Sequence, residues 1–347
     1  MPIKLSPRPV VCVLLVLAFS PLSGCNSDRG RGLPALHVDD SRVAVAGLSS
    51  GAYMATQIQL AWPEIFSGVA MVAGGPYGCA QGKLPTALST CMKGVPAPDI
   101  QALAARVEMR AHAGELGPLS ALSAARVFAL HGTRDRIVAG SVSRGSAALY
   151  EALRDSDPAL KSMQVSWDGN RPFAHNLPVA AHGDDCGKSE APYLGHCGFD
   201  AAGEIFAALF GNPLHAASKA RGELRRFDQN RFRPHGKDAY LADSGYVYLP
   251  PDCAAGKSCG LLVALHGCKQ DVSAVGTAFV RDAGFNRWAD AYDVAVLYPQ
   301  TRASFAPLNP QACWDWWGYS GADYDTRNGV QQQWLMNVLA ALGLPKP

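Results

Sequence analysis

The chain has 347 residues, of which 48% are hydrophobic and 17% charged, and its formal net charge is +2. This composition can form a sizeable core, and the near-neutral charge excludes the broad basic surface of a nucleic-acid-binding protein. The 35 glycines and 24 prolines are spread without internal repeats, which is typical of a loop-rich globular enzyme.

The first 24 residues have the pattern of an export signal. Two basic residues, Lys4 and Arg8, precede an apolar run over 10–19 that is too short to span a bilayer comfortably, and small residues follow it. We therefore expect an exported protein that is extracellular or periplasmic.

Leu-Ser-Gly-Cys at 22–25 resembles the bacterial lipobox, in which the cysteine becomes the lipid-modified first residue of the mature protein. The alternative is ordinary cleavage near Gly24. We expect lipidation of Cys25 and possible attachment to a membrane. The polar, glycine-rich residues 25–34 would then be a flexible tether, and 35–347 a single domain, because no Pro-rich or Ser/Gly linker divides them.

Short β-branched and apolar runs alternate with helical patterns along the rest of the chain. Strands are predicted at 42–46, 69–72, 126–130, 163–167, 245–249, 260–265 and 294–298, and helices at 50–61, about 141–153, about 284–292 and 329–342. This alternation predicts an α/β fold with a mostly parallel central sheet and helices on both faces.

Eight cysteines follow the export segment, and an even number in an exported chain indicates a disulfide framework. They are Cys79, Cys91, Cys186, Cys197, Cys253, Cys259, Cys268 and Cys313. None of their spacings forms a CxxC pair or a Cys/His cluster, so we expect no metal.

Ser49 is the central residue of Gly-Leu-Ser-Ser-Gly at 47–51. This pentapeptide arises easily by chance in a glycine-rich chain. Here, however, it lies between a predicted strand and a predicted helix, where a nucleophile elbow exposes its serine on a tight turn. We therefore predict that Ser49, rather than its neighbour Ser50, is the nucleophile of a serine esterase.

Asp135 and a later histidine complete a catalytic triad. Asp135 follows the predicted strand 126–130 by a short loop, which is where the acid of a hydrolase belongs. The candidate bases are His175, His182 and His196, and position favours His175 because it follows the strand ending at Trp167 most closely. The order Ser, Asp, His is the chain order of α/β-hydrolases.

One predicted strand is out of the usual order. The run 260–265 ends in His266-Gly267-Cys268 and resembles the oxyanion-loop strand that ordinarily precedes the nucleophile elbow, yet here it follows the elbow. A circular permutation that moves the start of the chain to the nucleophile strand explains this order. The backbone amides of Ser50 and Cys268 would then form the oxyanion hole.

With these blocks the sequence resembles the circularly permuted short-chain-length polyhydroxyalkanoate depolymerases, the extracellular type 2 catalytic domain of α/β-hydrolase fold. The matching motifs are GLSSGAYM at 47–54, AGGPYGC at 73–79, ALHGC at 264–268, YPQ at 298–300 and CWDW at 313–316. AHNLP at 174–178 matches the family's histidine segment.

The resemblance implies a serine esterase that hydrolyses poly(3-hydroxybutyrate) or related 3-hydroxyalkanoate polyesters and oligomers with the triad Ser49, Asp135 and His175 and no cofactor. It also implies that a tryptophan of 314–316 lines the substrate crevice, with Trp314 and Trp316 as the candidates. The implied disulfides are Cys79–Cys91, Cys186–Cys197, Cys253–Cys259 and Cys268–Cys313.

Two other functions fit the same residues. A feruloyl or acetylxylan esterase would use the identical triad on plant cell-wall esters, so only the crevice distinguishes it. A catalytically silent lipoprotein that binds polymer or cell-wall material would need no triad, and all three triad candidates are present. Neither an obligate protein partner nor nucleic acid is implied.

Overall fold

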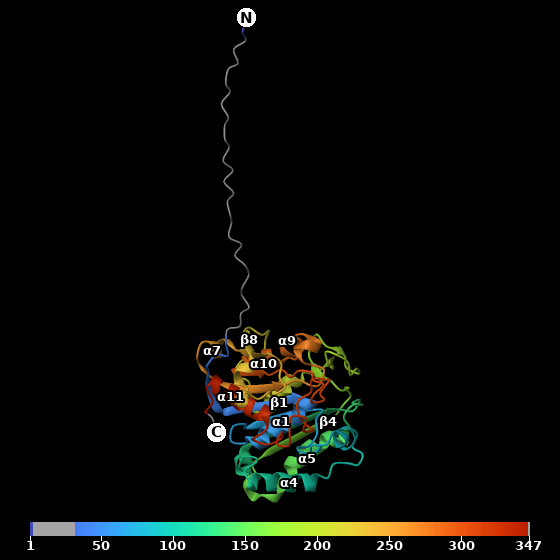
Figure 1. Cartoon of the computed structure of the whole chain (residues 1–347). Coiled ribbons are helices and arrows are strands. Elements are labelled where there is room, and N and C mark those ends of the chain that lie inside the picture. Colours follow the sequence, from blue (N-terminus) through green and yellow to red (C-terminus); the bar gives the residue numbers. More distant parts are fainter. Residues whose placement is uncertain (3–31, 346–347) are drawn as a thin grey trace.

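The structure, a computed structural model, describes residues 1–2 and 32–345 (Figure 1). The apolar run of the export signal, Cys25 and most of the tether expected over 25–34 therefore lie outside the described residues. In the part of the chain that is described, no helix is long and apolar enough to cross a membrane.

An eight-stranded sheet forms the centre of the molecule. Its strands are β1 (His37–Leu48), β2 (Gly68–Val72), β3 (Arg126–Gly132), β4 (Gln164–Arg171), β8 (Glu223–Asp228), β9 (Ser244–Leu249), β10 (Ser258–Leu265) and β11 (Val294–Tyr298). They lie in the order β4-β3-β2-β1-β10-β11-β9-β8. Only β9 runs against its neighbours, so the sheet is mostly parallel.

The central strands are buried on both faces, because helices cover the sheet from two sides. One face packs against α1 (Ser50–Ala61), α4 (Ile100–His112), α5 (Gly140–Ser156) and α11 (Val330–Leu342). The other packs against α6 (Ala201–Phe210), α9 (Ala278–Asp282) and α10 (Phe285–Tyr292). In β1, Val43 and Val45 point to the first face, and Ala44 and Ala46 to the second. The predicted α/β architecture is confirmed.

Short elements complete the fold. They are α2 (Leu84–Leu88), α3 (Thr90–Lys93), α7 (Pro251–Ala254), α8 (Val272–Val275) and a small sheet of β5 (Leu177–Val179), β6 (Asp184–Asp185) and β7 (Leu194–His196). The small sheet lies just after His175, and its strands belong to a loop that the sequence did not resolve into elements.

Besides these short elements, the sequence does not predict α4, α6 and β8. Helix α4 is amphipathic and begins at the N-cap Asp99, whose carboxylate accepts the Ala102 N–H at 3.0 Å. Helix α6 was also missed, and so was β8, an edge strand of charged and half-buried residues without clear alternation. Strand β1 begins five residues before its predicted start. Its register against β10 shifts between Val38 and Val43, which hides the early residues from a periodicity search.

The two ends of the described domain lie together. The Leu36 N–H donates to the carbonyl of Leu342, near the end of α11, at 2.8 Å. In a circularly permuted chain whose ends fall between that helix and the nucleophile strand, the two ends would meet at this place. Such a chain would also have β1 at the centre of the sheet, as this one does. Circular permutation stays a prediction that this order supports.

Four disulfides join the eight cysteines in the pairs that the family resemblance implies: Cys79–Cys91, Cys186–Cys197, Cys253–Cys259 and Cys268–Cys313. Four disulfides in one chain indicate export to an oxidising compartment. Three of them close short loops, whereas Cys268–Cys313 has a sequence separation of 45 and connects the loop after β10 to the tryptophan loop.

We predict that the Cys268–Cys313 disulfide stabilises the fold more than the Cys253–Cys259 disulfide does. A disulfide restricts the unfolded chain by closing a loop, and the loop closed by Cys268–Cys313 spans a sequence separation of 45, whereas that closed by Cys253–Cys259 spans 6. Replacing both cysteines of a pair by alanine removes this restriction. The expected losses in the free energy of unfolding are about 4 kcal/mol and about 2 kcal/mol respectively. Urea denaturation of the two double variants measures them, and equal losses would contradict the prediction.

Candidate active site

Ser49 lies at the turn between the carboxyl end of β1 and the start of α1. Its backbone has φ 56° and ψ −117°, a conformation that a non-glycine residue keeps only where its surroundings hold it. A Cβ on Gly47 would lie 2.2 Å from the Gly51 carbonyl, and one on Gly51 would lie 2.4 Å from the Leu265 carbonyl oxygen. Glycine is thus required on both sides of the turn, as in a nucleophile elbow.

Asp135 follows β3, and its side chain is completely buried. One carboxylate oxygen, Oδ2, lies 2.7 Å from Nδ1 of His175. The other, Oδ1, accepts the backbone N–H groups of Ile137 at 2.8 Å and Val138 at 3.0 Å. These bonds fix the carboxylate in one orientation toward the imidazole.

Burial alone would raise the pKa of Asp135, since it disfavours the charged carboxylate. The hydrogen bond and charge of His175, together with the N–H groups of Val138 and Ile137, outweigh that effect, and the pKa lies below its ordinary value. Asp135 is therefore ionised at neutral pH and stabilises a positive charge on the imidazole.

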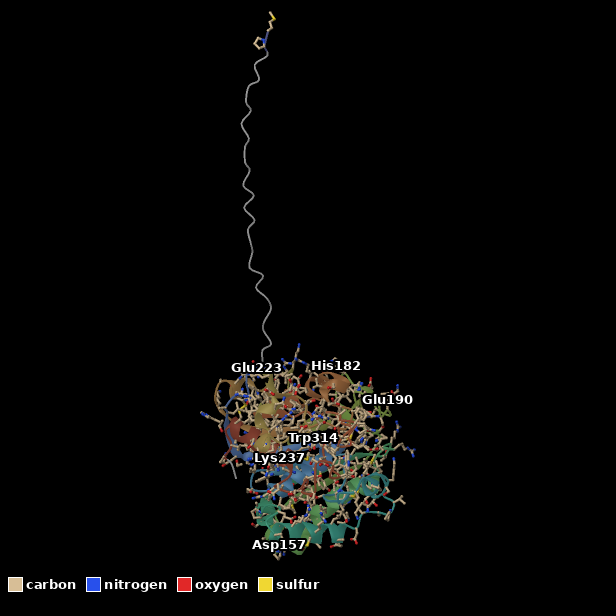
Figure 2. The ribbon with its side chains drawn as sticks, viewed as in Figure 1. Asp157, His182, Glu190, Glu223, Lys237 and Trp314 are labelled. Carbon is tan, nitrogen blue, oxygen red and sulfur yellow. A yellow bond between two sulfur atoms is a disulfide. The ribbon has the colours of Figure 1, made fainter. Side chains whose placement is uncertain are left out.

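His175 lies between β4 and the small sheet, and it is almost fully buried. Its backbone N–H donates to Oγ of Ser189 at 3.0 Å, which holds the loop. Because Nδ1 carries the proton shared with Asp135, Nε2 is left as the basic atom. The other two candidate bases, His182 and His196, are exposed and do not line the cavity described below; Figure 2 shows His182 at the periphery.

A cavity of about 490 Å³ contains the predicted nucleophile and base in its wall. Ser49 and His175 line it together with Ser50 and Cys268, so the predicted nucleophile, base and oxyanion-hole residues, from distant parts of the chain, meet in one place. Most of the remaining lining is apolar or aromatic and includes Leu88, Ile137, Leu308, Trp316 and Trp317. An apolar cleft with few polar groups is typical of a site for an uncharged organic ligand.

Ser50 and Cys268, whose backbone amides are predicted to form the oxyanion hole, both line this cavity. Ser50 is the first residue of α1, where a helix N–H has no intrahelical partner. Cys268 follows the end of β10, and within the described residues neither backbone amide donates a hydrogen bond. Two unpaired amides beside a serine can stabilise the negative charge of a tetrahedral intermediate.

Gln270, which sequence reasoning missed, holds the loop that carries Cys268. Its Oε1 accepts the Gly267 N–H at 2.8 Å, and its Nε2 donates to the Pro192 carbonyl at 2.9 Å. The buried amide thus joins the oxyanion loop to the loop of Ser189, which contacts His175. This role depends on tertiary contacts, so no local pattern identifies it.

His131 is a second buried histidine near the acid, and it was also missed. Its Nε2 lies 3.0 Å from the Val138 carbonyl and 3.5 Å from Oδ2 of Asp135. It therefore packs beneath the turn that carries the acid. The sequence could have identified His131 as a neighbour of the acid, because it lies in His-Gly-Thr-Arg-Asp at 131–135. The strand end that positions Asp135 also positions His131.

His266, whose motif suggested an oxyanion strand, is a structural residue. Burial lowers its pKa, so it is neutral. Its Nδ1 lies 2.7 Å from the Gly267 carbonyl, and its Nε2 accepts the Thr301 N–H at 3.2 Å. Both ring nitrogens are occupied, so His266 shapes the loop and has no free nitrogen for proton transfer.

The two candidate tryptophans differ in position. Trp316 lines the cavity and stacks on Tyr53 with ring centroids 4.4 Å apart. Trp314 does not line it; its side chain is buried, and its ring lies 5.6 Å from the His266 ring. Of the two candidates, Trp316 is therefore the one that lines the cavity. The sequence could not distinguish them, since both belong to one apolar cluster.

Asp315 holds the tryptophan loop in shape. Its buried carboxylate accepts the backbone N–H groups of Gly318, Tyr319 and Ser320 at 2.7–3.0 Å. Burial raises its pKa, although these bonds act in the opposite direction. The loop is thus built around one carboxylate and orients Trp316 toward the cavity.

One group of residues could hold a metal ion, and it lies apart from this cavity. In the described part of the chain, the ligand atoms of His215, Asp252 and Asp293 lie within 4.8 Å of one another. However, His215 already pairs with Asp293 at 3.2 Å, and Asp252 pairs with Lys257 at 2.9 Å. None of them lines the cavity with Ser49.

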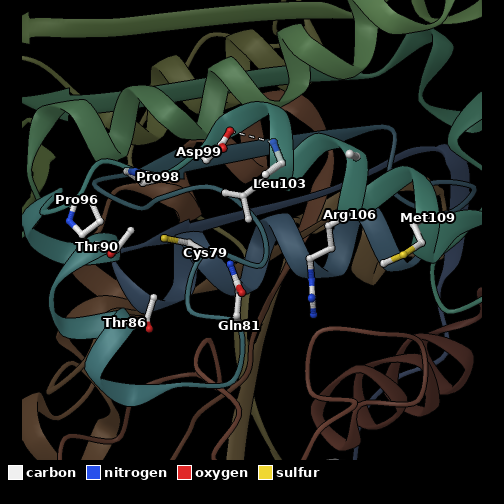
Figure 3. A pocket seen from close by; sticks show the side chains of 12 residues that line it. Cys79, Gln81, Thr86, Thr90, Pro96, Pro98, Asp99, Leu103, Arg106 and Met109 are labelled. Carbon is white, nitrogen blue, oxygen red and sulfur yellow. Dashed lines mark hydrogen bonds between the residues drawn. The ribbon is translucent and has the colours of Figure 1, made fainter.

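A second hollow of about 560 Å³ runs along α4 on the other side of the α2–α3 segment (Figure 3). Leu103 and Arg106 of α4 line it opposite Thr86 and Thr90. It is an open surface groove that contains none of the predicted catalytic residues. The disulfide Cys79–Cys91 fixes the segment that separates it from the catalytic cavity.

Comparisons with known sequences agree on one family. A family model described as Esterase PHB depolymerase matches residues 244–340. A poly(3-hydroxybutyrate) depolymerase of Delftia acidovorans is 35% identical over 305 residues, which are 86% of this chain and 59% of that protein. A polyhydroxybutyrate depolymerase of Talaromyces funiculosus is 32% identical over 334 residues, 91% of this chain and 93% of that protein. This chain thus spans less than two thirds of the Delftia protein.

Solved structures of PHB depolymerases also match this chain. The crystal structure of a PHB depolymerase from Penicillium funiculosum matches with a TM-score of 0.78 at 29% identity, covering 90% of this chain and 98% of that one. A PHB depolymerase variant complexed with an R3HB trimer matches with the same TM-score and coverage.

Replacing Asp135 by Asn should lower kcat by about 10⁴-fold, as it does in serine proteases, because the amide favours the wrong imidazole tautomer. It should also change acid stability. A carboxylate whose folded-state pKa is depressed stabilises the fold above pH ~4, and this contribution is lost as the pH falls through the folded pKa. The Asn variant should therefore lose less unfolding free energy between pH 7 and pH 3 than the parent, as measured by urea denaturation.

The matched control is Asp155→Asn, which removes an exposed carboxylate beside Arg154. It should leave both kcat and the pH dependence of unfolding close to the parent values. If the two variants behaved alike in acid, the Asp135–His175 interaction would not be the source of the effect.

Proposed function

This chain belongs to the family of poly(3-hydroxybutyrate) depolymerases, and on that premise we propose that it hydrolyses poly(3-hydroxybutyrate) or related 3-hydroxyalkanoate polyesters and oligomers. The observation that carries the proposal is the Asp135–His175 pair, 2.7 Å apart, in the wall of the cavity that contains Ser49. The R3HB trimer bound to a structurally similar depolymerase supports the class of substrate.

Acylation starts with proton transfer from Ser49 Oγ to His175 Nε2. The serine oxygen attacks the ester carbonyl, and the amides of Ser50 and Cys268 hold the resulting oxyanion. When the intermediate collapses, the carbon–oxygen bond to the alcohol breaks, and His175 returns its proton to the leaving alkoxide. The acyl group is then bound to Ser49.

Deacylation repeats these steps with water. His175 takes a proton from the water, the hydroxide attacks the acyl-enzyme, and the proton returns to Ser49 as the acid leaves. Asp135 stays ionised throughout and stabilises the imidazolium. The reaction uses only these side chains, two amides and water, so it calls for no metal ion or organic cofactor.

The lining of the cavity suits an aliphatic polyester. A hydroxyalkanoate chain carries methyl and methylene groups along an uncharged backbone, and these can pack on Leu88, Ile137 and Leu308. Trp316, rather than Trp314, is the proposed wall of a binding subsite, since it lines the cavity and Tyr53 supports its ring.

We also propose that Cys25 is lipidated and attaches the exported enzyme to a membrane. The support is the lipobox-like segment 22–25 and the oxidising compartment that the disulfides require. Mass spectrometry of the mature N-terminus should find a diacylglyceryl-modified cysteine, and an unmodified residue there would disprove lipidation.

Replacing Ser49 by Ala should abolish hydrolysis of a short p-nitrophenyl ester and of 3-hydroxybutyrate oligomers, because the acyl acceptor is lost. The fold should be retained, as circular dichroism can check. Ser50→Ala is the matched control, since only the Ser50 backbone amide takes part in the mechanism. Retained turnover in the Ser49 variant would overturn the assignment.

The parent enzyme should also be compared on hydroxybutyrate oligomers, amorphous polymer, feruloyl esters and acetylated xylan. Preference for the last two would favour a cell-wall esterase. A fluorophosphonate probe that failed to label Ser49 would favour a binding protein without catalytic activity.

A further inference from the structure

Lys269 is an exposed, positively charged residue in the lining of the catalytic cavity. It follows Cys268 directly and lines the same cavity as Ser49 and His175. A lysine on a protein surface usually serves solubility alone, but this one lies in a cleft otherwise suited to an uncharged polyester. The proposed mechanism leaves it without a role.

The backbone of Lys269 is held by its own N–H and by the bonds of the residues on either side of it. Its φ of 58° is in the left-handed region, which a non-glycine residue adopts at a cost of roughly 1 kcal/mol. Its N–H donates to the Gln311 carbonyl at 2.7 Å. On one side Cys268 is tied to Cys313, and on the other Gln270 is bonded to Gly267. The base of the side chain is therefore held firmly beside the oxyanion loop.

No carboxylate neutralises this charge. None of the residues lining the cavity is Asp or Glu, and across the described residues Lys269 makes no ion pair. The other titratable groups in the lining are His175, Tyr53 and Tyr193. Burial raises the pKa of both tyrosines, so they are neutral. The ammonium is thus available to an anion that enters the cavity.

The proposed substrates carry a charge at one place. The interior of a hydroxyalkanoate polyester is neutral, whereas an oligomer ends in one free carboxylate. Whichever ester bond is cleaved, that carboxylate stays on the fragment that leaves as the alcohol. A cation in the leaving-group half of the cleft would recognise only the acid end of a short chain.

We propose that Lys269 binds the terminal carboxylate of a 3-hydroxyalkanoate oligomer on the leaving-group side and makes the enzyme prefer free-acid oligomers to neutral chain segments. This inference rests on the proposed esterase function and specifies its substrate. It concerns binding, so the preference should appear mainly in KM rather than in kcat.

The test compares two substrates, the 3-hydroxybutyrate trimer as the free acid and the same trimer capped as its terminal amide. The parent enzyme should show a higher kcat/KM for the acid by about fivefold, the size expected for one partly solvated ion pair. Lys269→Gln should reduce this ratio to about one, and Lys269→Arg should keep it. Added salt should lower the parent's ratio, since it screens the charge.

Lys161→Gln is the matched control. It removes an exposed lysine before the start of β4, at the opposite end of the parallel sheet from the catalytic loops, and it should keep the parent's ratio. Unfolding curves check that the variants fold. A ratio unchanged in Lys269→Gln would overturn the inference and leave the esterase function intact. Failure of the parent to cleave either trimer would instead overturn the proposed function.

Discussion

The close contact of β1, α1 and β10 around Ser49 is the constraint on which the rest of the site depends. Gly51 has no Cβ, so the first turn of α1 can approach the carbonyls of Leu265 and His266. That approach brings the end of β10, and with it Cys268, next to the strained turn of Ser49. A side chain at position 51 would separate the nucleophile from one of the two amides proposed to stabilise its intermediate.

The loops of the site gain their order from a few buried polar groups. Asp135 accepts hydrogen bonds from two backbone amides. Gln270 joins the oxyanion loop to the loop beside His175. Asp315 accepts three backbone N–H groups in the loop that carries Trp316. Buried polar groups with satisfied hydrogen bonds define a single geometry. A catalytic site needs that precision, because transition-state stabilisation falls steeply with misplacement.

The sequence predicts the parts of this site that follow local rules. Ser49 comes directly after a buried strand, Asp135 follows another by a short loop, and the structure has both strands. Position and the family's histidine segment favour His175 over His182 and His196, and His175 is the one that contacts Asp135. The roles of Gln270 and His131 arise from tertiary contacts, which leave no periodic signal. The sequence leaves the choice between Trp314 and Trp316 open for a related reason, because composition does not tell which ring faces a cavity.

The distance along the chain between Ser50 and Cys268 has a consequence for when activity can begin. A polypeptide that emerges with its N-terminus first exposes the nucleophile segment early, but no fragment ending before Cys268 contains both amides of the proposed oxyanion hole. The Cys268–Cys313 bond further requires an oxidising environment. On the proposed mechanism, hydrolysis can therefore begin only after the segment that contains Cys268 has been made and has folded against the start of α1.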